Sequence, residues 1–406
     1  MPSITFRELA VPARNAGYWC DGRKIYFFIC TKINDNPTYK AAIYDIKADS
    51  LKTYDVSWPT SYGAGPGCLY KVTRGGGKTY LRVLYVNVNN KLVDIEWIFN
   101  EVNDTVSAQL KRSLYDANFS TETSWQSTVL GLGLALIMNY NSPYITLVDL
   151  KDFTKVWQID SGFDIYNPRA DAIWFPRDND IYVLVGRHLN TANFYRLKLY
   201  AKTLEEITNT NPGGDSPLPL MGDLIPLKDK TYIFASGGTV NNSSPKLIWF
   251  DEDLNKVGET PLNSIYDHAR LSGHATLGLD ENGYLTIAAI VPDNNVGIMS
   301  EEAACIIKID PSDYSLVSYN KFATWTSTDR KLEGIGIGTG GKYYNLPIVD
   351  WENSEVIIVT RNHNNNNITL CKIDFSDIEI TERNPRMYEV GVTKIPTQLT
   401  LQVIPL

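Results

Sequence analysis

The sequence lacks a segment long enough to cross a membrane as a helix. Its longest uncharged apolar run, residues 129–138 (VLGLGLALIM), has about half of the roughly 20 residues that a bilayer requires. The N-terminal stretch MPSITFRELAVP has no basic region followed by an apolar one, so we expect no signal peptide. We therefore expect no transmembrane segment and a cytoplasmic or virion-associated protein, with exposure at a surface as the alternative.

Cysteine is scarce, and its spacing suggests neither disulfides nor a metal site. The chain has 5 cysteines, an odd number, and no two of them form a C-x-x-C motif. This usage predicts free, mostly buried thiols, against the alternative of one structural disulfide. No spacing of Cys or His fixes a set of metal ligands, so we expect no metal and no other cofactor. The cysteines are Cys20, Cys30, Cys68, Cys305 and Cys371.

Clustered positive charge is also missing. The net charge is −8, the isoelectric point is about 5.2, and no run of five Lys or Arg occurs. A net negative chain repels phosphate backbones, so we do not expect a nucleic-acid partner. Two glycine-rich stretches, residues 72–79 and 336–342, lead into β-type runs, whereas a P-loop leads into a helix. We therefore do not expect either stretch to be a phosphate-binding loop.

A helical period is absent over any stretch of twelve residues. The best helical candidate, residues 104–114, is expected to be an irregular loop insertion. In contrast, the chain is rich in residues that fit a pleated surface, with 24 Tyr, 13 Phe and 9 Trp. The composition therefore predicts an all-β protein.

One pattern recurs along the chain at intervals of 49 to 64 residues. It consists of an apolar run, usually closed by Asp, then a short turn and another short apolar run. A turn followed by a dense apolar strand precedes most copies, so each unit is expected to hold four short strands. The residues that close the apolar run in the seven copies are Asp45, Asp94, Asp149, Lys198, Asp251, Asp310 and Asp374.

Seven units of this kind resemble the seven-bladed β-propeller class. The resemblance implies four-stranded antiparallel blades stacked around an axis, because one such sheet cannot bury both of its faces alone. The regular signatures of WD40, kelch and sialidase repeats are absent, so no subfamily is indicated. The competing prediction is a pair of β-sandwich domains.

The resemblance implies a single domain, residues 1–406, closed by a terminal strand. Two segments could complete the last blade and hide the exposed edges, residues 3–9 and 388–405. The expected blades cover approximately residues 14–60, 61–115, 122–162, 165–210, 216–262, 267–322 and 330–384.

An arginine precedes the inner strand of four units. In two of them a tryptophan follows five residues later, as in Arg14 with Trp19 and Arg169 with Trp174. In a propeller these arginines would converge at the channel mouth, where guanidinium groups bind carboxylate or phosphate. The alternative is that each arginine sets blade packing through a nearby acid. The predicted ligand-binding residues are Arg14, Arg169, Arg270, Arg330, Trp19, Trp174 and Glu333.

A second cluster, SIYDHARLSGHAT, brings together two of the four histidines. Histidine beside aspartate can serve acid–base chemistry, although the spacing does not force these side chains to converge. The candidate catalytic residues are His268, His274, Asp267 and Asp171.

The sequence favours a non-enzymatic binding or structural module, because no catalytic signature is found. Such a module would present loops and a channel mouth to a protein or glycan partner, as a surface or virion component. The alternative is a hydrolase or lyase that acts on an acidic sugar at the channel mouth, with the arginines holding the sugar carboxylate.

Overall fold

In the computed structural model, the residues that the structure describes form β-strands joined by turns and contain no helix. The all-β prediction is confirmed. No helix able to span a membrane is found in this part of the chain. The described residues are 1–12, 16–33, 36–59, 68–87, 90–117, 119, 125–129, 133–139, 142–169, 174–177, 180–188, 194–207, 222–227, 230–237, 246–251, 253–266, 273–292, 301–326, 328–334, 346–385 and 387–393.

The strands fall into two compact units. The first unit holds Met1–Leu9, Arg169–Gly334 and Leu346–Leu406, and the second holds Ala10–Pro168 and Ile335–Asn345. The expectation that residues 1–406 form one domain therefore stays a prediction.

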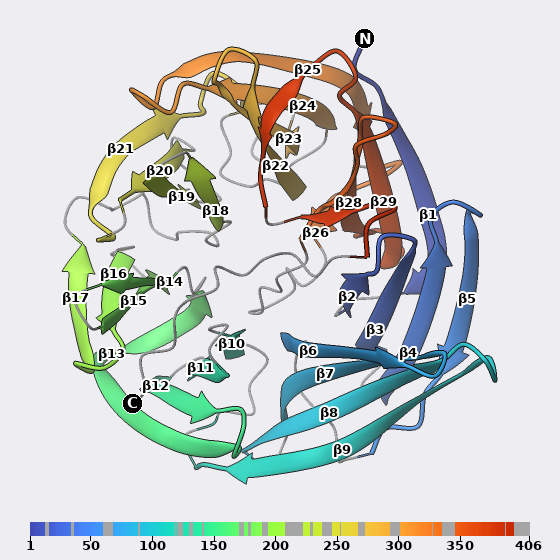
Figure 1. Ribbon diagram of the computed structural model, residues 1–406, viewed down its shortest axis with the longest axis vertical. Coiled ribbons are helices and arrows are strands. Elements are labelled where there is room, and N and C mark those ends of the chain that lie inside the picture. Colours follow the sequence, from blue (N-terminus) through green and yellow to red (C-terminus); the bar gives the residue numbers. More distant parts are fainter. Residues whose placement is uncertain are drawn as a thin grey trace. The chain divides into compact units, whose positions relative to one another are not determined.

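The second unit contains antiparallel sets of four strands, each taken in chain order (Figure 1). The first set is β2 (Ala16–Cys20), β3 (Lys24–Ile33), β4 (Asn36–Asp45) and β5 (Ser50–Asp55). The second set is β6 (Cys68–Gly75), β7 (Lys78–Asn87), β8 (Lys91–Asn100) and β9 (Thr105–Tyr115). The third set is β10 (Trp125–Val129), β11 (Leu134–Asn139), β12 (Ser142–Asp149) and β13 (Thr154–Arg169).

The first unit repeats the same plan. One set is β14 (Trp174–Arg177), β15 (Asp180–His188), β16 (Phe194–Lys198) and β17 (Thr203–Ile207). Another is β18 (Gly222–Leu227), β19 (Lys230–Gly237), β20 (Lys246–Phe250) and β21 (Lys256–Pro261). A further set is β22 (Gly273–Asp280), β23 (Leu285–Pro292), β24 (Glu301–Ile309) and β25 (Leu316–Thr326). The last is β26 (Leu332–Gly334), β27 (Ile348–Asp350), β28 (Glu355–Asn362) and β29 (Asn367–Asp374), with β1 (Ile4–Pro12) beside it. The four-stranded antiparallel sheets are as predicted, whereas the number of blades stays a prediction.

The N-terminal strand completes the last sheet. In the strand order of this sheet, β1 lies next to β29. The N-terminal segment therefore covers the edge of the final β28–β29 hairpin. The main-chain N–H of Asp374 donates to the carbonyl of Ser3 at 2.9 Å. The Glu8 carboxylate accepts side-chain amide bonds from Asn362, Asn365 and Asn367. Of the two terminal segments expected to close the fold, residues 3–9 therefore take this place.

The segment after β29 packs across the first unit. Strand β30 (Ile380–Arg383) pairs with β22, and the short β31 (Tyr388–Glu389) pairs with β27 in parallel. The Asn384 side chain donates to the carbonyl of Thr276 at 3.0 Å. Gly278 has a φ of 137°, and a Cβ built on it would lie 2.0 Å from the carbonyl oxygen of Glu382. Only glycine leaves room for this crossing.

The recurring aspartates cap the hairpin turns. In the third copy, for example, the Asp149 carboxylate accepts the main-chain N–H groups of Lys151 and Asp152 at 2.6 and 3.0 Å. Such bonds satisfy donors that a tight turn leaves without partners. The hairpin caps are Asp45, Asp149, Asp251 and Asp310, and Asp374 caps the turn that follows β29 in the same way.

Two copies depart from this rule: the fourth, which has Lys198 at this position, and the second. The expected position in the second copy was wrong, because Asp94 lies within β8 and away from its turn. Asn100 ends that strand and caps the turn through the N–H of Asn103 at 3.2 Å. Asp94 has apolar residues on both sides. In the sequence it therefore resembles an aspartate that closes one apolar run before the next begins, which explains the misplacement.

The remaining prediction to correct concerns residues 104–114. Apart from Asp104, which lies in the β8–β9 turn, they belong to strand β9 rather than to an irregular loop. An outer strand has half-buried residues such as Val106 and Ala108 between exposed ones, so its apolar signal is weak. The cysteines are buried, as predicted, and all are free thiols. Burial raises the pKa of the Cys20, Cys30 and Cys371 thiols to about 12, despite opposing hydrogen bonds.

Side chains of one sheet repeatedly bond to the outer hairpin turn of the next. Tyr54 and Lys52 of β5 donate to Asp104 in the β8–β9 turn, at 2.7 and 2.9 Å. Thr260 of β21 donates to the carbonyl of Tyr314 in the β24–β25 turn at 2.6 Å. These contacts join consecutive sheets in the same sense within each unit, as the stacking of blades requires.

Candidate functional site

The structure describes only part of the predicted channel-mouth site. Residues Arg14, Asp171, Asp267, His268 and Arg270 lie outside the described residues. Arg169, Trp174 and Glu333 belong to strands β13, β14 and β26, but their side chains are outside the described part. The ligand-binding and catalytic roles of all eight stay predictions.

Trp19 is part of the packing of the second unit. It sits near the hairpin end of β2, and its side chain is only 4% exposed. Its ring centroid lies 5.4 Å from that of Tyr26, and the Arg74 guanidinium carbon lies 5.7 Å from the Trp19 ring. Its role toward a ligand stays a prediction.

Arg330 and His274 both belong to the first unit. The Arg330 guanidinium carbon stands 4.0 Å from the centroid of the Phe6 ring of β1, a cation–π contact. His274 is half-buried in β22, opposite Ala289 of β23. Arg330 therefore takes part in holding the N-terminal strand, and its role toward a ligand stays a prediction.

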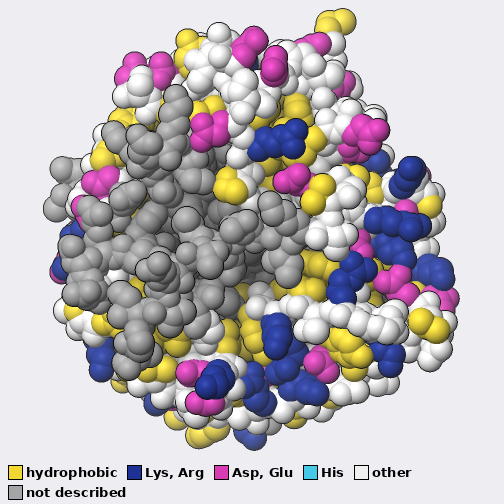
Figure 2. All heavy atoms as spheres, in the orientation of Figure 1, with side chains coloured by type: hydrophobic (Ala, Val, Ile, Leu, Met, Phe, Trp, Pro, Cys, Tyr) yellow, Lys and Arg dark blue, Asp and Glu magenta, His cyan; other side chains and the backbone are white. Residues whose placement is uncertain are grey.

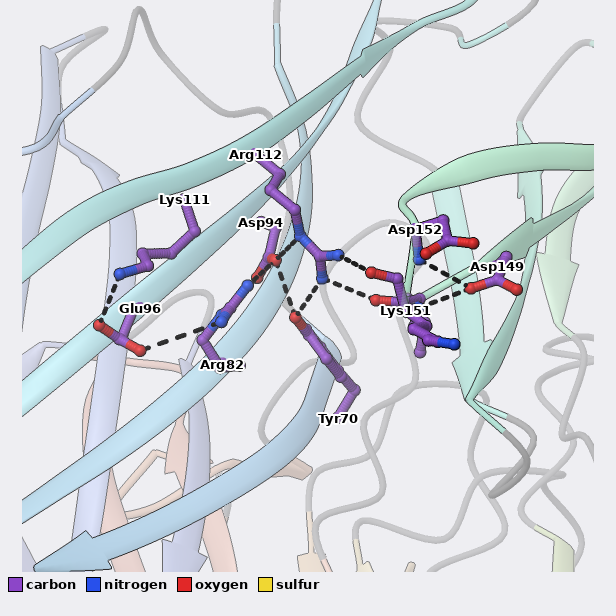
Figure 3. A network of polar contacts seen from close by, with 10 residues as sticks. Tyr70, Arg82, Asp94, Glu96, Lys111, Arg112, Asp149, Lys151 and Asp152 are labelled. Carbon is purple, nitrogen blue, oxygen red and sulfur yellow. Dashed lines mark hydrogen bonds and ion pairs between the residues drawn. The ribbon is translucent and has the colours of Figure 1, made fainter.

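A polar network absent from the sequence predictions lies on one face of the β6–β9 sheet (Figure 3). Asp94 has no exposed surface, and its carboxylate accepts bonds from two arginines and a tyrosine. The Arg82 guanidinium donates from Nε at 2.9 Å and also from Nη2, and Arg112 Nε donates at 2.9 Å. The Tyr70 hydroxyl donates to the second carboxylate oxygen at 2.8 Å. Arg82 and Arg112 thus share one buried negative charge.

Arg112 also joins this sheet to the next hairpin. Its Nη1 donates to the carbonyl of Lys151 at 2.6 Å, and its Nη2 donates to the carbonyl of Leu150 at 2.7 Å. Both carbonyls lie in the β12–β13 turn that Asp149 caps from the other side. Asp94 orients Arg112, and Arg112 positions this hairpin.

Further cations lie on the same face. Lys71 of β6 stands directly opposite Arg82 of β7, and cross-strand partners share a face of a sheet. Arg82 in turn stands opposite Glu96, whose carboxylate also lies 3.4 Å from Lys111 Nζ. Like charges placed opposite each other destabilise a sheet, so the Lys71–Arg82 pair has a cost for folding. We call Lys71, Arg82, Asp94, Glu96, Lys111 and Arg112 the basic face.

The other face of this sheet belongs to the hydrophobic core. Trp97 packs against Phe28 of β3, with ring centroids 6.3 Å apart. Phe99 meets Tyr26 edge-on at 5.3 Å. The sheet is therefore anchored on its apolar side, and the basic face carries its polar residues.

The ionisation states of Tyr70 and Arg82 are fixed near neutral pH. Burial raises the pKa of the Tyr70 hydroxyl, and the Asp94 charge and hydrogen bond raise it further, so the tyrosine stays neutral. Burial lowers the pKa of Arg82, but the bonds to Asp94 outweigh it and raise the pKa overall. This arrangement can attract anions but is poorly suited to proton transfer.

Charge composition was the available sequence signal for this face. Between Cys68 and Tyr115 the sequence has seven Lys or Arg and four Asp or Glu, within a chain of net charge −8. Figure 2 shows dark blue side chains gathered over β6–β9 in the lower part of the view, with fewer magenta ones among them. No run of basic residues marks this excess, because a sheet brings together residues that are separated in sequence.

A second feature is a hollow of about 530 Å³ in the first unit, between β17 and β21. Its charged walls are paired within the chain. Arg196 binds Glu205 at 3.0 Å and donates to the carbonyl of Asp253 at 2.6 Å, and Lys256 pairs with Glu259. Among the described residues, no group of three or more His, Cys, Asp or Glu could hold a metal ion.

Comparisons with known proteins bear on the fold alone. No protein-family model matches the sequence, and no curated protein matches it. The WD40 domain of coronin from Toxoplasma gondii is similar in structure, with a TM-score of 0.51 and 8% identity, over 96% of this chain and 92% of that one. The Pan2 WD40 domain from Neurospora crassa gives 0.44 and 12% identity, over 92% of each chain. Hydrazine synthase from Kuenenia stuttgartiensis gives 0.47 and 12% identity, over 90% of this chain and 96% of that one.

WD40 domains are β-propellers of four-stranded blades. The likeness to the coronin domain extends over nearly the whole of both chains. Together with the repeated four-stranded antiparallel sheets, it shows that this chain has a β-propeller-like fold.

Proposed function

We propose that the chain is a non-enzymatic binding module whose partner is another protein. The observation that carries the proposal is the basic face of β6–β9, which keeps cations together at a cost for folding. Surfaces that bind partners are arranged for complementary charge rather than for stability. WD40 propellers, with which the chain shares a fold, are known as interaction modules, and this analogy supports the same use.

The proposal includes the finer predictions made from the sequence. The module would be one domain of seven blades over residues 1–406. Its loops and channel mouth would form further contact surfaces, with Arg14, Arg169, Arg270 and Arg330 at the mouth. A glycan partner, and a place at a surface or in a virion, stay predictions from the sequence.

Native mass spectrometry of the protein isolated from its own source tests this function. We expect a stoichiometric complex with at least one other protein chain, weakened by salt, because charge complementarity is screened. A lone chain that cleaves acidic oligosaccharides would contradict the proposal and favour the hydrolase or lyase alternative.

A further inference from the structure

We propose that the basic face of β6–β9 binds an acidic, extended segment of the partner protein. This inference rests on the proposed function and names the chemical class of the partner. It starts from the charge balance of the face. Arg82 and Arg112 share the carboxylate of Asp94, while Arg82 and Lys111 approach Glu96 at 4.0 and 3.4 Å.

The positive charge is therefore only partly neutralised. Three cations share two carboxylates, and Lys71 is exposed and has no ion pair with any residue that the structure describes. The adjoining β12–β13 hairpin contributes Lys151 as well as Asp149 and Asp152, so five cations stand against four carboxylates and one positive charge remains in excess. An anionic ligand would supply the missing negative charge.

The cations follow a row across the sheet. Lys71 lies on β6, Arg82 on β7 and Lys111 on β9, with Glu96 of β8 between the last two, so the row crosses the width of four strands. At about 4.8 Å between strands, this width is about 14 Å, which an extended peptide covers in four or five residues. The row thus fits a short segment with a few carboxylates.

The charge of the rest of the molecule selects protein over nucleic acid. The whole chain has a net charge of −8 and would repel a long polyanion. A short acidic segment, in contrast to a long polyanion, would place its negative charge at the basic face alone and would not be repelled by the rest of the molecule. The positive potential of this face would also increase the association rate at low salt.

The mutational test compares two lysine reversals. Lys71→Glu reverses a charge on the basic face, and Lys47→Glu makes the same change at an exposed turn after β4. The probe is a short fluorescent peptide of alternating glutamate and serine, with a matched glutamine–serine peptide as control. Fluorescence anisotropy gives the affinities, and circular dichroism checks that both variants stay folded.

We expect the acidic peptide to bind the wild-type protein, and Lys71→Glu to weaken this binding at least about fivefold at low salt. Lys47→Glu should change it less than about twofold, and added salt should weaken it throughout. Equal losses in both variants, or no preference over the glutamine peptide, would overturn the inference. Tighter binding of a single-stranded oligonucleotide of equal charge would overturn it in favour of nucleic acid.

Experiments on the complex isolated from the protein's own source distinguish a failure of this inference from a failure of the proposed function. Suppose that native mass spectrometry finds a stable protein partner, but that chemical cross-linking of this complex gives no cross-link to residues 68–115. The binding function then stands and the acidic-segment inference fails. If no partner is found, the proposed function itself fails.

Discussion

The Asp180 carboxylate accepts the main-chain N–H of Tyr200 at 2.7 Å, across the hairpin where the repeat has lysine instead of aspartate. It also accepts the N–H of Ala201 at 3.0 Å. In the other capped turns the aspartate comes from the strand that ends at the turn. Here the neighbouring strand β15 supplies the carboxylate that Lys198 cannot provide.

Removing this cap should destabilise the β16–β17 hairpin. We expect Asp180→Ala to lower the free energy of unfolding by about 1–2 kcal/mol, because two main-chain donors lose their acceptor. Asp180→Asn should cost less, since one amide oxygen can still accept a bond. Urea denaturation measures both changes. Asp152→Ala, an exposed turn aspartate, is the control and should change stability by less than about 0.5 kcal/mol.

The buried Asp94 should be far more sensitive than Glu96, a half-buried acid of the same face. We expect Asp94→Ala to cost about 3–5 kcal/mol, because it leaves Arg82 and Arg112 without their shared carboxylate. Glu96→Ala, which removes a more exposed partner of the same face, should cost less than about 1 kcal/mol. Equal losses in the two variants by denaturant unfolding would show that Asp94 does not organise the network.

Gly278 should not tolerate a side chain. Gly278→Ala would place a Cβ against the Glu382 carbonyl at a φ that L-residues rarely adopt. We expect a loss of more than about 2 kcal/mol, with hydrogen exchange increasing in β22 and β30. The matched control is Gly75→Ala, where a Cβ has no neighbour within 4 Å. Its stability should stay close to that of the wild type.

The closing strand β1 should be sensitive to acid. Burial acts to raise the pKa of Glu8, but hydrogen bonds from Asn367, Asn362 and Asn365 and the charge of Arg330 outweigh it and lower the pKa. Because the folded-state pKa lies below the unfolded value, the contribution of Glu8 to stability is present above about pH 4.3 and is lost as pH falls through the folded pKa.

Glu8→Gln therefore should lower the melting temperature at pH 7 by about 1–2 °C. The difference from the wild type should shrink as the pH falls below about 4. Differential scanning calorimetry at several pH values measures it. A difference that stays constant down to pH 3 would mean that the Glu8 charge does not hold the strand.

The sequence predicted the fold better than it predicted the site. Turn residues and apolar runs are local signals, so the four-strand units and a closing terminal strand could be read from them. Asp94 was misplaced because of its apolar neighbours, and its actual role was missed because Arg112 and the β12–β13 hairpin are distant in sequence. The basic face was missed for the same reason, since Lys71 and Arg82 become neighbours only when β6 pairs with β7.

Site-specific photo-crosslinking in source extracts tests the central claim most directly. A photoreactive residue at position 71 reports on the basic face, and one at Val317, exposed on the outer strand β25, serves as the control. We expect a cross-link to one protein from position 71, lost at high salt, with none from position 317. Cross-linking from position 317 but not from position 71, or from neither, would contradict the claim that this propeller binds a protein through β6–β9.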